Sequence, residues 1–198
     1  MNLIHDRDLV IHKGIQLFCS QGYTNLGIDK ICLETGMTKG AFYNAFKSKE
    51  NYLLEVLTQY GLSMQNYLSQ MLNDPANGKN AWQRLDSLYQ HLLTVQPKQQ
   101  YIGCLINNMM SELGMTNPIV AQTLELEFNK LIAIIEKNVV LAQKEGVLNS
   151  NLPAAAIAEM LHSSFFGALT RAKNCQDNQK SLQSMHLLMQ SVPLLQTV

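Results

Sequence analysis

The residue types that could carry chemistry in this chain are four cysteines and a few histidines. The cysteines are Cys19, Cys32, Cys104 and Cys175, with separations of 13, 72 and 71 residues. A structural zinc site needs Cys or His ligands at short fixed spacings, and the sequence has no such pair. We therefore expect no metal site and no cofactor. Scattered cysteines in a reducing compartment are most often small buried hydrophobic groups, and less often reactive thiols.

A cysteine beside a histidine can act as a nucleophile, and the pairs to consider are Cys104 with His91 or His162. The sequence contains no phosphate-binding glycine loop, no HExxH motif and no nucleophile elbow that would support catalysis. A lone cysteine with scattered histidines is a weak signal. We therefore expect no catalytic residues, and a Cys/His enzyme is the unfavoured alternative.

Composition predicts a folded protein. The chain has 198 residues, 46% of them hydrophobic and 15% charged, and 15 Lys+Arg balance 15 Asp+Glu. This apolar content supports a buried core and disfavours disorder. No apolar run reaches the ~20 residues that span a bilayer, and the N-terminus does not resemble a signal peptide. We expect a cytoplasmic protein with no membrane partner. Zero net charge at first disfavours DNA binding, because DNA-binding domains usually carry a basic excess.

Helices must position these residues, because long stretches lack proline and period-2 alternation is scarce. The expected class is all-α. Gly22 and Gly36 suit the ends of the first two helices, Thr38 and Ser48 suit the starts of the third and fourth, and Gly27 is a weaker cap for the second. The expected helices cover residues 6–20, 28–35, 39–46, 49–72, 81–95, 103–113, 118–146, 153–173 and 179–195.

Two short helices joined by Glu34-Thr35-Gly36-Met37-Thr38 are typical of a helix-turn-helix. The wider string contains Gly22-Tyr23, Ile28-x-x-Ile31-Cys32, the segment GMTKGAFYNAFKSKE at 36–50, and Leu53-Leu54. It resembles the DNA-binding domain of the TetR family of bacterial transcriptional regulators over residues 8–57, most specifically over 38–50. The resemblance implies a three-helix DNA-binding domain at 1–50 and a helical effector-binding and dimerisation domain at 51–198.

The resemblance places DNA contacts on the third helix, whose N-terminal residues approach base edges. Small side chains at Gly40 and Ala41 allow close approach, and Ala41 can touch a thymine methyl. Asn44 stands where the family often has His, and it can bond adenine bidentately. Tyr43 and Lys49 are phosphate candidates. The alternative is an ordinary solvated surface. The expected DNA-binding residues are Thr38, Lys39, Gly40, Ala41, Tyr43, Asn44 and Lys49.

The zero net charge does not exclude DNA. Residues 1–50 hold six Lys or Arg against five Asp or Glu, and Lys39, Lys47 and Lys49 surround the expected recognition helix. Lys39 can reach a guanine or a phosphate. Non-specific affinity should be modest and salt-sensitive, so tight binding should need a dimer on a cognate site.

Beyond the DNA-binding domain, the resemblance implies a homodimer formed by helices near 154–172 and 180–195. Their apolar residues are Ile157, Leu161, Phe165, Phe166, Leu182, Leu187, Leu188 and Met189. The alternative is that these residues only fill a monomer core, and some of them are expected to do both. Aromatic, polar and methionine side chains suit an effector pocket, although ordinary core packing is the alternative for most of them. The pocket candidates are Trp82, Tyr89, His91, Tyr101, Met109, His162 and Phe165.

The segment Gly103-Cys104-Leu105-Ile106-Asn107, with GALTRAK at 167–173, is similar to a NemR-like subgroup whose cysteine here responds to electrophiles or oxidants. A helix N-terminus would stabilise a Cys104 thiolate and lower its pKa, and Lys173 is the candidate cation beside it. The alternative is an inert, packed Cys104 and a non-covalent hydrophobic effector. We interpret Cys19 and Cys32 as structural, whereas Cys175 can be exposed.

These observations together predict a homodimeric repressor that binds a pseudo-palindromic double-stranded operator and responds to a small molecule or an electrophile. A helical protein-interaction module that does not bind DNA is the rival class, and retention of DNA at low salt separates the two.

Overall fold

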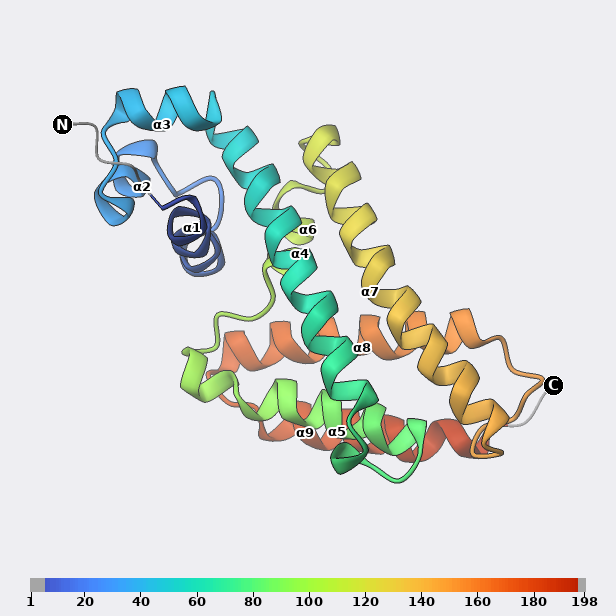
Figure 1. The fold of residues 1–198 in the computed structure, drawn as a ribbon. Coiled ribbons are helices and arrows are strands. Elements are labelled where there is room, and N and C mark those ends of the chain that lie inside the picture. The colour runs from blue at the N-terminus through green and yellow to red at the C-terminus, as the bar shows by residue number, and fades with distance from the viewer. Residues whose placement is uncertain (1–5, 196–198) are drawn as a thin grey trace. The chain divides into compact units, whose positions relative to one another are not determined.

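The computed structural model describes residues 6–195, and within this range the chain is helical with no strand. Contacts between helices divide it into two units. The first unit runs to Ser63 and includes Cys104–Phe128, and the second contains Met64–Gly103 and the chain from Asn129 onward. The α-helices are α1 (Arg7–Gln21), α2 (Ile28–Thr35), α3 (Lys39–Phe46), α4 (Lys49–Asn73), α5 (Ala81–Thr94), α6 (Leu105–Leu113), α7 (Pro118–Lys144), α8 (Ala154–Cys175) and α9 (Gln179–Ser191) (Figure 1).

The expected all-α class is confirmed, and α2 and α3 have the expected bounds. The other helices differ by a few residues at their ends. For example, α6 begins at Leu105 rather than 103, because Gly103 has a φ of 77° and Cys104 is the N-cap. Pro193 lies in the short 3-10 helix η3 (Val192–Leu194), so α9 stops at Ser191 instead of reaching 195. Two more 3-10 helices, η1 (Pro75–Asn77) and η2 (Gln96–Gln99), were not expected.

Aromatic packing holds α1, α3 and the start of α4 together in the first unit. The Phe42 and Phe46 rings lie with their centroids 5.4 and 4.7 Å from that of Tyr52. The Tyr52 hydroxyl donates to the Val10 carbonyl over 2.7 Å. Gly14 lets α1 approach, since an added Cβ would lie 2.4 Å from the Tyr52 hydroxyl oxygen. This core fixes α3 by its inner face, which leaves its outer face for contacts with other molecules.

In the second unit, α9 packs against both α5 and α8, and Figure 1 shows the three helices side by side. Buried polar groups tie them together. The Trp82 indole N–H donates to the Met189 carbonyl over 3.0 Å, and the Ser181 hydroxyl donates to the Ala168 carbonyl over 2.8 Å. Such bonds satisfy groups that would otherwise be costly to bury.

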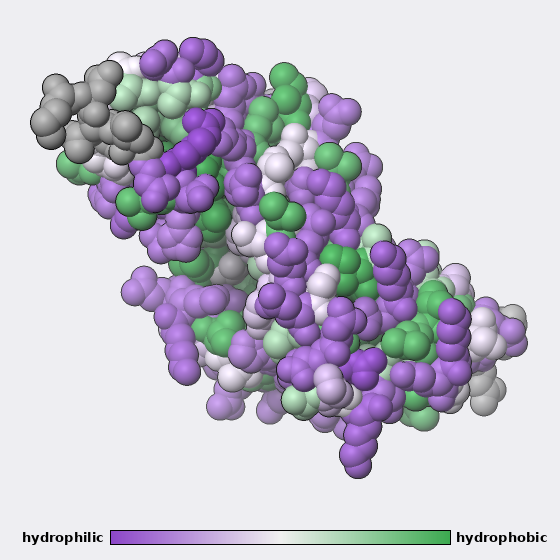
Figure 2. All heavy atoms as spheres, viewed as in Figure 1, coloured by the Kyte–Doolittle hydropathy of each residue, from purple (hydrophilic) through white to green (hydrophobic). Residues whose placement is uncertain are grey.

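Among the described residues, no helix is long and apolar enough to cross a membrane. Within the same range, no group of three or more His, Cys, Asp or Glu side chains is placed to hold a metal ion. On the face shown in Figure 2, hydrophobic residues form small patches separated by hydrophilic ones.

Candidate nucleic-acid interface and effector site

The turn between α2 and α3 has the geometry of a helix-turn-helix. Gly36 ends α2 in the left-handed region with a φ of 71°, and Met37 is buried. The Thr38 hydroxyl oxygen accepts the Ala41 backbone N–H over 3.1 Å, which confirms the expected cap of α3. Gly27 offers α2 no side-chain cap, also as expected. The short turn and the cap hold the start of α3 in one conformation.

The outer face of α3 is accessible along most of its length. Phe42 and Phe46 are buried, whereas Lys39, Gly40, Tyr43 and Asn44 are exposed. The Tyr43 side chain, 47% exposed, places a phenol beside the helix. Of the expected contact residues on α3, only Ala41 is half-buried, so its methyl group is less available than the sequence suggested.

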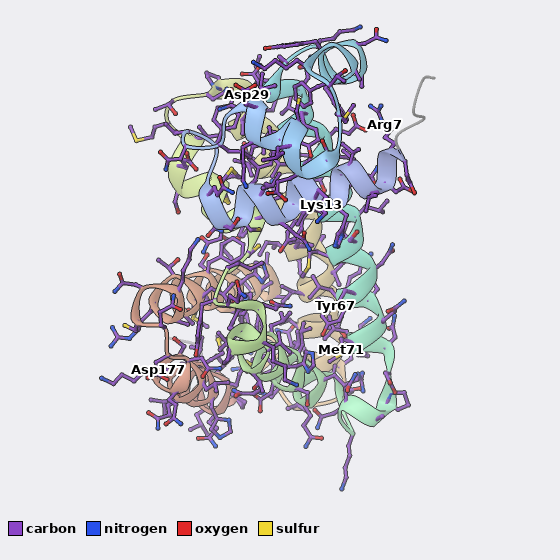
Figure 3. All side chains as sticks on the ribbon, turned by 90° about the vertical axis from the view of Figure 1, so that its left-hand side faces the viewer. Arg7, Lys13, Asp29, Tyr67, Met71 and Asp177 are labelled. Carbon is purple, nitrogen blue, oxygen red and sulfur yellow. The ribbon has the colours of Figure 1, made fainter. Side chains whose placement is uncertain are left out.

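The exposed lysines near α3 have polar partners within the chain. The Lys39 ammonium lies 2.6 Å from a carboxylate oxygen of Asp29, a residue of α2 that is labelled in Figure 3. Lys30 pairs with Glu34 on α2 in the same way, over 2.5 Å. The Lys47 ammonium donates to the Asn44 carbonyl over 2.9 Å. Exposed ion pairs are weak, so a DNA phosphate can compete for these side chains.

Lys49, the predicted phosphate contact at the start of α4, is bonded within the chain. Its ammonium donates to the carbonyls of Tyr23 and Leu26, over 2.9 and 3.0 Å, and lies 4.1 Å from the centroid of the Tyr23 ring. Partial burial lowers the pKa of Lys49. The side chain therefore fastens the α1–α2 loop to α4 through these two carbonyls. Ser48 caps α4 as expected, by accepting the Asn51 N–H.

A carboxylate on α6 holds the other side of the same loop. Glu112 accepts the backbone N–H of Tyr23 over 2.9 Å and that of Thr24 over 2.7 Å. Partial burial alone would raise the pKa of Glu112, but the N–H groups of Thr24 and Tyr23 outweigh it and lower that pKa. Sequence reasoning missed this residue, because its partners lie 88 and 89 positions away and no local motif connects them.

Cys104 lies directly before α6, as expected, but its surroundings differ from those of a reactive thiol. It is 7% exposed, and the Tyr60 hydroxyl donates to its sulfur over 3.3 Å. Burial raises the pKa of Cys104, although bonds from Tyr60 and from the Asn107 and Ile106 backbone oppose it. The expected lowering of the thiol pKa is therefore wrong. Burial also raises the pKa of Tyr60, so this neighbour is a protonated phenol and not a base.

The candidate cation Lys173 belongs to the second unit and Cys104 to the first, so their pairing stays a prediction. Cys19 and Cys32 are buried, which agrees with structural roles, and Cys175 is exposed at the end of α8.

Three of the pocket candidates come together between α5 and α8. The ring centroid of Tyr89 lies 5.3 Å from that of Phe165 and 6.2 Å from that of His162. Phe166 joins them, with its centroid 4.8 Å from that of His162. All four side chains are buried. We call these four residues the aromatic cluster.

The other pocket candidates lie elsewhere. Trp82 is buried, but its indole N–H is bonded to α9. His91 is exposed on α5, with its ring 6.3 Å from that of Tyr67. Tyr101 is half-buried, with a φ of 53°, in the segment before α6. Met109 is fully buried in α6 of the first unit. The spacing of these residues along the sequence does not distinguish a buried position from an exposed one.

The expected dimer residues of α8 and α9 divide into two sets. Ile157, Leu161 and Met189 are already buried within the chain, as are Phe165 and Phe166. Leu187, in contrast, is 64% exposed, and Leu182 and Leu188 are half-buried. On α8 the exposed face contains Met160 and Gly167, and a Cβ added at Gly167 would meet no described atom within 4 Å. The accessible part of these helices is therefore smaller than the sequence pattern suggested.

Comparison with known proteins places both parts of the chain in one family. The family model described as bacterial regulatory proteins, tetR family, matches residues 10–56. A second family model, described as the tetracyclin repressor-like C-terminal domain, matches residues 81–188, which is more than half of the chain. The HTH-type transcriptional repressor DhaR of Mycobacterium sp. (strain GP1) is 28% identical over 84% of this chain and 82% of its own length.

Solved structures agree with the fold. Reduced NemR of E. coli, 20% identical, superposes with a TM-score of 0.81 over 94% of this chain and 96% of its own. A cysteine-substituted CifR in complex with 26-bp operator DNA is 18% identical. It superposes with a TM-score of 0.84 over 98% of this chain and 100% of its own. The capped turn, the accessible face of α3 and the match of both family models lead to one conclusion: the chain belongs to the TetR family of bacterial transcriptional regulators.

Proposed function

We propose that this TetR-type transcriptional repressor binds a pseudo-palindromic operator as a homodimer in the cytoplasm and releases it when a small effector binds. The observation that carries the proposal is the fixed, accessible start of α3. Thr38 caps the helix, and Lys39, Gly40, Tyr43 and Asn44 project from it. Two such helices in one dimer reach successive major grooves when the half-sites lie ~34–36 Å apart, or a multiple of this. The operator complex of CifR supports the same use of the fold.

The residues expected to contact DNA have different roles in this proposal. Asn44 reads a base, for which adenine is the best match. Gly40 and Ala41 let the helix approach the base edges. Lys39 and Tyr43 contact the DNA backbone, and Lys39 must first leave Asp29. Thr38 acts through the cap that orients the helix, and Lys49 through the loop that it fastens.

Selection from random double-stranded DNA tests the proposal. The wild-type protein should enrich a sequence with two-fold symmetry. Asn44→Ala should enrich a related sequence in which one base pair per half-site is no longer fixed, a loss of about 1–3 kcal/mol in discrimination. Asn174→Ala, on the exposed end of α8, is the matched control and should leave the selected sequence unchanged. If the wild-type protein enriches no symmetric sequence, the operator proposal is wrong.

The effector is proposed to bind without a covalent bond. Cys104 is buried beneath the Tyr60 hydroxyl, and its raised pKa leaves little thiolate at neutral pH. Electrophile sensing by Cys104, with Lys173 as its cation, is the second candidate, suggested by the likeness to NemR. Measuring operator release by an electrophile with wild type and Cys104→Ser separates the two: only the second candidate predicts that release is lost in the variant.

A further inference from the structure

One buried polar atom in the aromatic cluster lacks a partner. The Tyr89 side chain is fully buried, and its hydroxyl makes no hydrogen bond to any described residue. Burial raises the pKa of Tyr89, so the group is a protonated donor at neutral pH. Leaving such a hydroxyl unbonded is unfavourable, and native proteins keep few groups in this state. The Tyr89 hydroxyl can therefore donate a hydrogen bond to an acceptor on a bound molecule.

The neighbours of Tyr89 define what that acceptor can belong to. Phe165 and Phe166 present aromatic rings, and the three ring centroids next to His162 lie 4.8–6.2 Å from its own. Burial lowers the pKa of His162 to about 4, so the imidazole is neutral near pH 7. The cluster thus offers aromatic faces without a formal charge. These four side chains offer a charged ligand no opposite charge in return for the hydration that it would lose, which is unfavourable.

We propose that Tyr89, His162, Phe165 and Phe166 form a binding site for an uncharged aromatic molecule that carries a carbonyl oxygen. The Tyr89 O–H donates to this oxygen, and the rings pack against the aromatic body of the ligand. The inference rests on the proposed effector-regulated function and names the chemical class of its effector. Because the four rings contact one another here, a bound ring must replace one of these contacts. The bound form therefore differs from this one, as an effector requires.

A set of three probes isolates the hydrogen bond. Acetophenone carries the carbonyl, ethylbenzene has the same size without it, and benzoate adds a charge. Binding is measured by calorimetry on the full chain without DNA. Wild type should bind acetophenone roughly tenfold more tightly than ethylbenzene, the effect of one good hydrogen bond in a buried site, and should not bind benzoate. Tyr89→Phe should bind the two neutral probes equally.

The control variant is Tyr67→Phe, which removes a half-buried hydroxyl from α4 in the same unit. It should retain the preference for acetophenone. Without any probe, Tyr89→Phe should melt at a higher temperature than wild type by roughly 2–4 °C, because it removes an unbonded buried group. A lower melting temperature would mean that the hydroxyl has a partner and would overturn the inference.

The inference also fails if acetophenone does not bind at millimolar concentration, if ethylbenzene or benzoate binds equally well, or if Tyr89→Phe keeps the preference. None of these results bears on operator binding, which is measured separately with wild-type protein and no probe. If the proposed function is wrong, the wild-type protein will instead fail to select a symmetric DNA sequence, whether or not the probes bind. The two failures are therefore distinguishable.

Discussion

Lys49 illustrates how a side chain in the expected position can serve a different purpose. The residue lies at the start of α4, near the recognition helix, where a cation would suit a phosphate. Its ammonium is instead bonded to two carbonyls of the α1–α2 loop and rests on the Tyr23 ring. A lysine has three donors and no acceptor, and the two loop carbonyls already accept from this one over 2.9 and 3.0 Å. Its contribution to DNA binding should therefore be structural.

Replacing Lys49 by Met separates these roles. The variant should lose about 1–2 kcal/mol of stability, since bonds from a charged donor are worth about 1.5–3 kcal/mol when buried and less when partly exposed. Operator affinity should fall, but its dependence on salt should keep the wild-type slope. Lys39→Met is the matched control and should reduce that slope by roughly 0.9, the value for one phosphate contact. Thermal melting and salt titrations of operator binding measure both. Unchanged stability with a flatter slope for Lys49→Met would restore the phosphate role.

Helix α6 is attached directly to the DNA-reading part of the first unit. Its first residue follows Cys104, which bonds Tyr60 of α4, and its last turn carries Glu112, which bonds the α1–α2 loop. Gly22 permits this contact, because an added Cβ would lie 2.7 Å from a Glu112 carboxylate oxygen. The Asn108 amide also donates to the Cys19 carbonyl of α1 over 3.4 Å. A shift of α6 must therefore move or release the loop that precedes α2.

Glu112→Gln tests this attachment. The neutral amide keeps one acceptor, so the loop N–H groups of Tyr23 and Thr24 should exchange faster with solvent, and stability should fall by about 1 kcal/mol after allowance for partial exposure. The pKa of Glu112 is lowered in the folded protein from the ordinary 4.5. Its contribution is thus complete above about pH 4.5 and is lost as pH falls through the lowered value.

The variant should consequently show a weaker loss of stability in that acidic range than wild type. Urea unfolding at several pH values, with hydrogen exchange of the loop amides, provides the measurement. Glu125→Gln, an exposed residue of α7 in the same unit, is the control and should behave as wild type. Equal exchange rates of the loop amides in wild type and Glu112→Gln would show that α6 does not hold the loop.

The sequence predicted those features whose causes are local. The bounds of α2 and α3 follow from Gly36 and Thr38, which act on their own neighbours in the chain. The partners of Lys49 lie 23 and 26 residues away, and those of Glu112 lie 88 and 89 away, so no spacing rule predicts them. Cys104 shows the same limit, because its place before α6 was predictable but its burial beneath Tyr60 was not.

We propose that two copies act together on DNA, because most of the lysines around the recognition helix are already bonded within the chain. Lys39 and Lys30 are paired with carboxylates, and Lys49 is bonded internally. One copy should therefore bind weakly, while a dimer gains from placing its second head at high effective concentration. The proposed contact is the exposed part of α8 and α9, where Leu187 and Met160 are accessible and Gly167 allows close helix approach.

Leu187→Glu tests the dimer without disturbing the core, because the side chain is 64% exposed in the single chain. A carboxylate at the proposed contact would have to be buried against a second copy, which is unfavourable. Light scattering after gel filtration should give the mass of one chain instead of two, and operator affinity should fall by 10²-fold or more, the usual order for loss of a linked second site. Met115→Glu, at a fully exposed residue of the first unit, should leave mass and affinity unchanged. A Leu187→Glu protein that remained dimeric would place the dimer contact on another face, whereas a monomer with wild-type affinity would show that one reading head suffices.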